Sequence, residues 1–357
     1  MDAGLRAVCR FFGDWRDRDD MVLATILATQ GSTYRKAGTR VLLAGNAASS
    51  GLISGGCLEG ELREHARQVL AAKRARRVVF DTRNDDPLWG MGLGCEGAID
   101  VWIEPVLAVN AFGPVPYLEH CLAQQTSGLL LTVVGGEASS SELGCFAARD
   151  WSGGIPRVRN ELSAALGRRL ELPPPGGAGL EWLELQGRRV EISVAPVDLP
   201  PRLLLCGAGR DAVPVQEFAA ALGWGVRVYD HRAAHAVAAS FPAATVFSAP
   251  VDELSARIDL SCIDAAVVMS HSLQADQSYL EQLLRSPVRH IGLLGPRARR
   301  ERILGELGAL SPRDLARLHA PVGLDIGAAS PEGIAMSIVA QMHAALAGRT
   351  GGPFGVR

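Results

Sequence analysis

The sequence predicts an α/β protein with two domains, an N-terminal mixed α/β domain and a C-terminal Rossmann-like domain with a doubly wound parallel sheet. Three observations lead to this fold class. The 357 residues are enough for two or three separate cores. Short apolar runs, bounded by glycine and proline, alternate with amphipathic stretches. From residue 202 onward, a strand, a glycine turn, a helix and a second strand follow one another in the order of a nucleotide-binding βαβ unit.

The first hundred residues predict two helices and a set of short strands. Leu5–Trp15 is amphipathic, and the apolar run Met21–Ala28 that follows has the length of a buried strand. A second amphipathic helix is expected at 58–72, with its charged residues on a solvated face. Further strands are expected at 40–43, 51–53, 77–81 and 98–103.

The middle of the chain contains a weaker repeat of this first part. Gly128–Val134 resembles the strand around Thr25, and Val190–Val197 resembles Ile99–Val106. In the second pair each run ends at a proline followed by valine, which suits a strand that leaves its sheet. We therefore expect this stretch to extend the N-terminal sheet; chance similarity between short apolar strings is the alternative.

The domain boundary is expected at the proline-containing linker 198–201. The N-terminal domain would then be 1–199, with a core of 1–110 and an extension of 111–199, and the C-terminal domain would be 200–357. In the latter, strands are expected at 202–206, 225–229, 244–247, 265–269 and 290–294, with a helix after each glycine or loop segment. The last helix should begin at Ser330 as N-cap, with Pro331 in its first position.

Composition limits the classes of function. The hydrophobic content of 48% and charged content of 21% are those of an ordinary globular protein. A formal net charge of -2 provides no general attraction for nucleic acid or for an anionic membrane, so neither partner is expected. The seven cysteines form no CxxC pair, and the N-terminus lacks the apolar core of a signal peptide. We therefore expect a reduced, cytoplasmic protein.

The nucleotide fingerprint lies at residues 207–212. Gly207-Ala208-Gly209-Arg210-Asp211-Ala212 has the GxGxxA form, and Asp230 stands where an acid that binds ribose is expected. This predicts NAD(P), FAD or another nucleotide as a ligand, although Asp230 has the alternative of pairing with Arg232. His271 follows a strand end, where ligand sites of open sheets collect; a hydrogen-bonded loop histidine is the alternative. No acid or base suited to hydride transfer stands out.

Two cysteines lie in glycine-rich turns of the N-terminal domain. Cys57 lies in Ser54-Gly55-Gly56-Cys57-Leu58-Glu59-Gly60 and Cys95 in Gly92-Leu93-Gly94-Cys95-Glu96-Gly97. Glycines permit positive φ and close approach of a ligand to backbone N–H groups. A thiol in such a turn is a candidate soft ligand, and a small buried hydrophobe is the usual alternative.

The basic segment 30–40 provides charged and polar hydrogen-bond donors. Ser32, Arg35, Lys36 and Arg40 are suited to a phosphate or another oxyanion, with an ordinary solvated turn as the alternative. If both kinds of segment serve one ligand, the two cysteine turns and the residues 35–40 must converge on one pocket.

Together these residues resemble the XdhC/CoxI family of xanthine dehydrogenase accessory factors. The motifs that carry the resemblance are Gly31-Ser-Thr-x-Arg-Lys-x-Gly-x-Arg40, Ser54-Gly-Gly-Cys-Leu-Glu59, Gly92-Leu-Gly-Cys-x-Gly97, Val101-x-Ile-Glu-Pro105, Gly207-Ala-Gly209, Asp230-x-Arg232, Val268-Met-Ser-His271, Ile291-Gly-Leu-Leu-Gly295 and His319-Ala-Pro-Val-Gly-Leu-Asp-Ile-Gly327. Two positions depart from the pattern, Arg210 where relatives often have histidine and Pro296 where serine is common.

The resemblance implies a chaperone of the molybdenum cofactor (molybdopterin), an accessory factor rather than a turnover enzyme. It would bind and protect the cofactor, assist its sulfuration with a cysteine desulfurase, and deliver it to a xanthine dehydrogenase-type enzyme. A homodimer is expected. Cys57 and Cys95 are candidate molybdenum contacts, and the other candidate cofactor-binding residues are Ser32, Arg35, Lys36, Arg40, Gly55, Gly56, Glu59, Gly207, Gly209, Asp230, Arg232 and His271. The competing hypotheses are an NAD(P)-dependent oxidoreductase and a protein-binding scaffold.

Overall fold

The computed structural model describes residues 3–46, 48–81, 97–151, 161–307 and 310–353. The chain divides into two compact units, Asp2–Leu199 and Pro200–Arg357. Every hydrophobic cluster of the described residues is built from side chains of a single unit. Each unit therefore has its own core.

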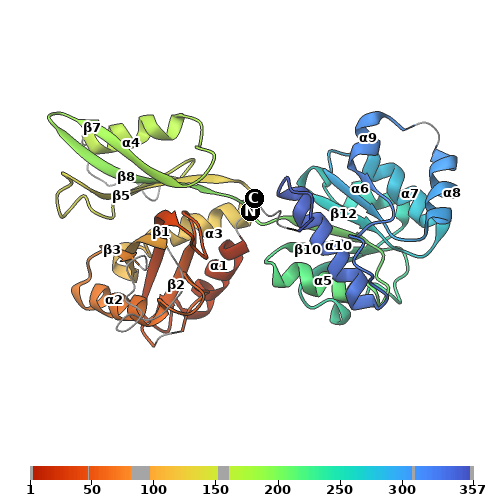
Figure 1. The fold of residues 1–357 in the computed structure, drawn as a ribbon, viewed down its shortest axis with the longest axis horizontal. Helices are drawn as coiled ribbons and strands as arrows, with labels where there is room; N and C mark the ends of the chain where they lie inside the picture. Colours follow the sequence, from red (N-terminus) through yellow and green to blue (C-terminus); the bar gives the residue numbers. More distant parts are fainter. Residues whose placement is uncertain (1–2, 47, 82–96, 152–160, 308–309, 354–357) are drawn as a thin grey trace. The chain divides into compact units, whose positions relative to one another are not determined.

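The first unit contains two four-stranded antiparallel sheets (Figure 1). Their strand orders are β2-β1-β4-β3 and β6-β5-β8-β7. In chain order the elements are α1 (Ala3–Trp15), β1 (Met21–Gly31), β2 (Arg40–Ala44), α2 (Glu59–Ala72), β3 (Arg76–Asp81), β4 (Gly97–Val106), α3 (Val115–Gln124), β5 (Gly128–Gly136), β6 (Phe146–Ala148), α4 (Glu161–Glu171), β7 (Gly179–Leu185) and β8 (Arg188–Val197). A 3-10 helix lies at Ala108–Asn110.

The two sheets are copies of one α-β-β-α-β-β arrangement. Strand β1 pairs antiparallel with β4, and β5 pairs in the same way with β8. Each pair contains one register shift, between Ile26 and Ala28 in β1 and between Val133 and Gly135 in β5. Both β1 and β5 also end at a glycine with positive φ. The repeat predicted from the apolar strings is therefore present in the described structure.

Two expectations for this unit are wrong. The second copy does not extend the first sheet, because its strands pair among themselves and form a sheet of their own. Residues 51–53 are not a strand but part of the turn before α2. Gly51 begins this segment and the pair Gly55–Gly56 follows it closely. The few residues between these glycines are too short a run to form the hydrogen bonds of a strand.

Alternation along the strands accounts for the layers of this unit. In β1, Val22 and Ala24 point to a cluster that α2 covers, whereas Met21 and Leu23 point to a cluster that α1 and α3 cover. The second sheet is covered by α4 on one face, as Figure 1 shows. Arg77 of β3 joins the copies, since its guanidinium donates to Asp100 in the same sheet and to Glu191 of β8.

The copies differ most in their loops. Gln186 and Gly187 alone connect β7 to β8, whereas the equivalent connection between β3 and β4 comprises residues 82–96. In repeat proteins, insertions confined to one copy are often where binding occurs. The longer connection, which contains Cys95, belongs to the first copy.

The second unit contains a parallel six-stranded sheet in the order β11-β10-β9-β12-β13-β14. Numbered from the start of the unit this is 3-2-1-4-5-6, the order of dinucleotide-binding folds, and the predicted Rossmann-like fold is confirmed. Its elements are β9 (Arg202–Cys206), α5 (Ala212–Ala221), β10 (Gly225–Asp230), β11 (Ala244–Ser248), α6 (Leu254–Arg257), β12 (Ala265–Val268), α7 (Leu273–Leu284), β13 (His290–Leu293), α8 (Arg297–Leu307), α9 (Pro312–Arg317), β14 (Leu318–His319) and α10 (Pro331–Leu346), with 3-10 helices at Ala238–Ser240, Val251–Glu253 and Leu260–Cys262.

Helices cover both faces of this sheet. Alternate residues of β9 point to different clusters, Leu203 and Leu205 towards α5 and α10 and Leu204 towards α7. Double burial of this kind explains why the strands are continuous apolar runs. At the start of α10 the Ser330 hydroxyl oxygen accepts the N–H of Gly333, as the cap prediction requires.

Candidate functional site

The turn that carries Cys57 connects β2 to α2 and is held from inside by a carboxylate. Glu59, the first residue of α2, accepts the Ser54 N–H at 2.9 Å and the Ser54 hydroxyl at 2.6 Å. The Ser54 Oγ in turn accepts the N–H groups of Gly56 and Leu58. Burial alone raises the pKa of Glu59, but the hydrogen bonds from Ser54, together with those from backbone N–H groups of Leu58 and Glu59, outweigh it, and the pKa lies below its usual value. A buried carboxylate that stays ionised thus fixes the shape of the turn.

The glycines of this turn leave its backbone open. Gly55 and Gly56 are exposed, a Cβ on either would meet nothing within 4 Å, and Gly56 has φ of +116°. Among the described residues, nothing accepts the backbone N–H of Gly55 or of Cys57. Two free donors next to a half-buried thiol, at the start of a helix, are suited to an anionic group.

The basic segment forms an exposed turn between β1 and β2. The Thr33 hydroxyl donates to the Arg35 carbonyl at 2.9 Å, and the Lys36 Nζ lies 3.5 Å from the Thr33 Oγ1. Arg35 stands over the Tyr34 ring, 5.7 Å from its centroid. Ser32, Arg35 and Lys36 are exposed.

These two turns line one hollow of about 40 Å³. Its lining residues are Ser32, Thr33, Tyr34, Ile53, Ser54, Gly55, Cys57, Leu58, Phe80, Gly97 and Ile99. Gly97 permits the close approach, because a Cβ there would collide with the Ser32 carbonyl oxygen. A cavity needs about 10–15 Å³ of such space to hold one water, so the hollow holds one small group rather than a whole cofactor.

Arg40 lies apart from the hollow. It is 5% exposed in β2 and shares the environment of Glu104 of β4, which is 6% exposed. Burial raises the pKa of Glu104 to about 8, although the nearby Arg40 opposes that shift. The structure therefore places Arg40 in the interior of the sheet and Arg35 and Lys36 at the surface.

Cys95, the second predicted thiol, lies outside the described residues. Gly97, two positions later in the same motif, lines the hollow. Within the residues that the structure describes, no group of three or more His, Cys, Asp or Glu side chains is placed to bind a metal ion. No described helix is long and apolar enough to cross a membrane.

The nucleotide fingerprint lies at the switch point of the parallel sheet, between β9 and β12. A Cβ on Gly207 would lie 2.5 Å from the Met269 carbonyl oxygen, so only glycine allows the two loops to approach. Asp230 is fully buried and accepts the Ala208 N–H and three contacts from Arg232. A ribose would have to displace Arg232 to reach this carboxylate.

A histidine–aspartate pair lies beside the same loop. The His271 Nε2 is 2.9 Å from the Asp211 Oδ2, and the imidazole ring would be 3.6 Å from a Cβ on Gly209. His271 has φ of +62°, an uncommon conformation for a residue other than glycine. Gly209 and His271 are therefore close together, and the Asp230–Arg232 pair at the end of β10 meets the same loop through the Ala208 N–H.

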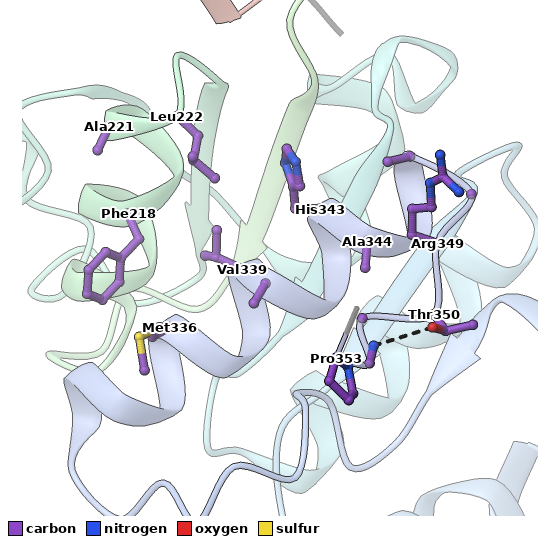
Figure 2. A pocket seen from close by; sticks show the side chains of 15 residues that line it. Phe218, Ala221, Leu222, Met336, Val339, His343, Ala344, Arg349, Thr350 and Pro353 are labelled. Atoms are coloured by element: carbon purple, nitrogen blue, oxygen red, sulfur yellow. Dashed lines mark hydrogen bonds between the residues drawn. The ribbon is translucent and has the colours of Figure 1, made fainter. Parts of the chain in front are cut away.

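A larger, mainly apolar groove of about 1110 Å³ lies on the second unit between α5, α10 and the residues 348–353. Figure 2 shows Phe218 of α5 and Met336 of α10 at one end of it, and Arg349 near the other. None of the candidate site residues lines this groove.

Comparison with known proteins places both units in one family. Residues 14–81 match the XdhC and CoxI family, and residues 203–342 match the XdhC Rossmann domain. A relative from Bacillus subtilis (strain 168), described as a probable xanthine dehydrogenase subunit, is 31% identical over 333 residues, which are 91% of this chain and 93% of that protein. The chain belongs to the XdhC and CoxI family.

A solved structure supports the family assignment over the whole chain. The crystal structure of a xanthine dehydrogenase from Bacillus halodurans matches with a TM-score of 0.74 and 28% identity, covering 97% of this chain and 96% of that one. The resemblance predicted from the motifs is thus confirmed. The segment matched to the XdhC and CoxI family includes the Cys57 turn and the basic turn.

The sequence did not predict the apolar residues that line the hollow. Phe80 and Ile99 form part of its lining from the neighbouring strands β3 and β4, and only strand pairing brings them there. Tyr34 was also missed, although its position inside the basic motif was a usable signal.

Proposed function

We propose that this chain is an accessory factor that binds the molybdenum cofactor and delivers it to a xanthine dehydrogenase-type enzyme. The observation that carries the proposal is the hollow at Cys57, where a thiol and a turn with two free backbone N–H groups meet residues 32–34. Arg35 and Lys36 follow directly in the same exposed turn but do not line the hollow. The names of the two relatives support a partner of the xanthine dehydrogenase type.

The residues in and beside the hollow offer donors that suit separate chemical groups of this cofactor. Its molybdenum is held by dithiolene sulfurs, and a thiolate such as that of Cys57 is a soft ligand of the same kind. Its phosphate suits Arg35, Lys36 and the free N–H groups of the Cys57 turn. When bound, the cofactor would supply the redox-active metal, while the chain binds, orients and shields it.

Further parts of the proposal concern partners. A cysteine desulfurase would be the source of sulfur for the cofactor while the cofactor is held here. The chain would act as a homodimer in the cytoplasm. Neither nucleic acid nor a membrane has a role in this proposal.

The first test measures cofactor content. Chain purified from cells that synthesise the cofactor should contain molybdenum and pterin, and Cys57→Ala should lower both about tenfold, equivalent to roughly 1.4 kcal/mol of binding free energy. Cys145→Ala is the matched control, because Cys145 is also half-buried and lies in the turn before β6 of the second copy. Unchanged pterin and molybdenum in the combined Cys57→Ala, Cys95→Ala variant would refute the cysteine assignment.

An NAD(P)-dependent oxidoreductase is the competing proposal. The strand order and the Gly207 turn favour a nucleotide at the switch point. The pairing of Asp230 with Arg232 disfavours ribose recognition by that acid. The same preparations separate the two proposals when they are titrated with NADH and NADPH by calorimetry, since cofactor loading without nucleotide binding supports only the first.

A further inference from the structure

Tyr34 differs from every other tyrosine of the chain. It is 69% exposed, whereas Tyr117, Tyr229 and Tyr279 are 1% exposed or less. Its side chain lines the hollow together with Cys57. No described residue forms a hydrogen bond with its hydroxyl group. A large aromatic ring is therefore presented to solvent at the edge of the candidate site.

The internal repeat shows that the fold does not need this ring. The equivalent turn of the second copy, residues 137–145, contains no aromatic residue. It also replaces the basic residues by acids, and Glu142 there pairs with Arg188. The same strand pairing forms without the aromatic ring, so the exposure of Tyr34 is a property of the first copy's site rather than of the sheet.

The size of the hollow indicates where a ring would lie. About 40 Å³ admits one small group, so the planar part of any larger ligand must lie outside it, over the exposed edge. Tyr34 and Gly55 are exposed residues of that edge. Of these, Tyr34 alone offers an aromatic face, and stacking on a planar heterocycle is the favourable use of such a face.

We propose that Tyr34 is the platform on which the planar ring system of the bound ligand stacks, with Arg35 fixing the position of the tyrosine ring. The ligand class is a bicyclic nitrogen heterocycle that carries a phosphate, which the pterin of the proposed cofactor represents. This inference rests on the proposed function and adds to it the residue that recognises the ring. The guanidinium 5.7 Å from the Tyr34 centroid holds the platform by cation–π attraction.

The test uses the full-length chain and two probes, the isolated molybdenum cofactor and a fluorescent oxidised pterin that carries a phosphate. Tyr34→Phe and Tyr34→Trp should keep the wild-type dissociation constant within about twofold and should still quench the pterin on binding. Tyr34→Ala should weaken binding about tenfold and should lose most of the quenching. Because Tyr34 is exposed, all three variants should melt like the wild type.

Trp182→Ala is the matched control. Trp182 is 48% exposed in β7 and has Arg189 over its ring at 5.0 Å, so it is a similar aromatic–arginine pair away from the hollow. Removing it should leave pterin binding unchanged. If Tyr34→Ala binds as tightly as wild type while Cys57→Ala does not, Tyr34 is not the platform although the proposed function holds. If the wild-type chain binds neither probe, the proposed function and this inference both fail.

Discussion

At the scale of single residues, a sequence motif does not show which of its residues contact a ligand and which hold the local structure in place. Cys57 and Glu59 lie two residues apart in one motif, and the resemblance implies that both contact the cofactor. In the structure the Cys57 side chain lines the hollow, whereas both carboxylate oxygens of Glu59 accept hydrogen bonds from Ser54. Glu59 therefore positions the thiol's turn from inside the protein.

This division of roles predicts the effect of Ser54→Ala. The substitution removes the hydroxyl that Glu59, Gly56 and Leu58 all contact, and it leaves a buried carboxylate short of a donor. The free energy of unfolding should fall by roughly 1–3 kcal/mol. Urea unfolding followed by tryptophan fluorescence measures the change.

Glu61→Ala is the control for that measurement. Glu61 lies in the same helix, and its side chain is 54% exposed, so its removal should change the free energy of unfolding by less than about 0.5 kcal/mol. Equal effects of the two substitutions would mean that the Ser54–Glu59 contacts do not hold the turn.

At the scale of elements, the edge of the parallel sheet contains a pair of stacked histidines. His290 begins β13 and His319 ends β14, and their ring centroids are 4.0 Å apart. His290 is 2% exposed, and neither of its ring nitrogens has a partner among the described residues. Burial, with a smaller effect of His319, lowers the pKa of His290 from 6.5 to about 3.

Stability of the second unit should therefore decrease in acid. Between pH 6.5 and about 3 the unfolded chain binds a proton at His290 that the folded chain does not, so folding is favoured less as pH falls. The loss from this group is up to about 1.4 kcal/mol per pH unit. In His290→Phe, which keeps an aromatic ring against His319, melting temperatures measured from pH 8 to pH 5 should decline less steeply.

His235→Gln is the comparison for the acid effect, because His235 is exposed and its removal should leave the slope unchanged. If His290→Phe has the same pH dependence as the wild type, the buried pair does not cause the acid sensitivity.

The repeat in the first unit shows how far patterns of elements can be predicted. The similarity of Ile99–Val106 to Val190–Val197 correctly indicated two equivalent strands, β4 and β8. It did not indicate whether the second set joins the first sheet. That outcome depends on which strands, far apart in the sequence, form hydrogen bonds with each other. The alternative pairings are of similar strength, and no local sequence pattern distinguishes them.

At the scale of the whole molecule, the chain consists of two units with separate cores. The clusters of the first unit comprise residues between Leu5 and Leu199, and those of the second comprise residues between Leu203 and Leu346. Residues 1–199 and 200–357 produced as separate chains should each be folded and unfold cooperatively, as heat capacity measurements and circular dichroism would show. Loss of cooperative unfolding in either chain would mean that its core depends on the other unit.

By itself the sequence determined the family, the order of the strands and helices in the second unit, and the turns that carry Cys57 and the basic residues. These features are local, because glycine conformations, helix caps and apolar periodicity act within a few residues. Only the tertiary structure decided that the repeat forms its own sheet, that Arg40 is buried while Tyr34 is exposed, and that the Glu59 carboxylate accepts hydrogen bonds from Ser54. Each of those outcomes depends on which distant strand or loop a side chain meets.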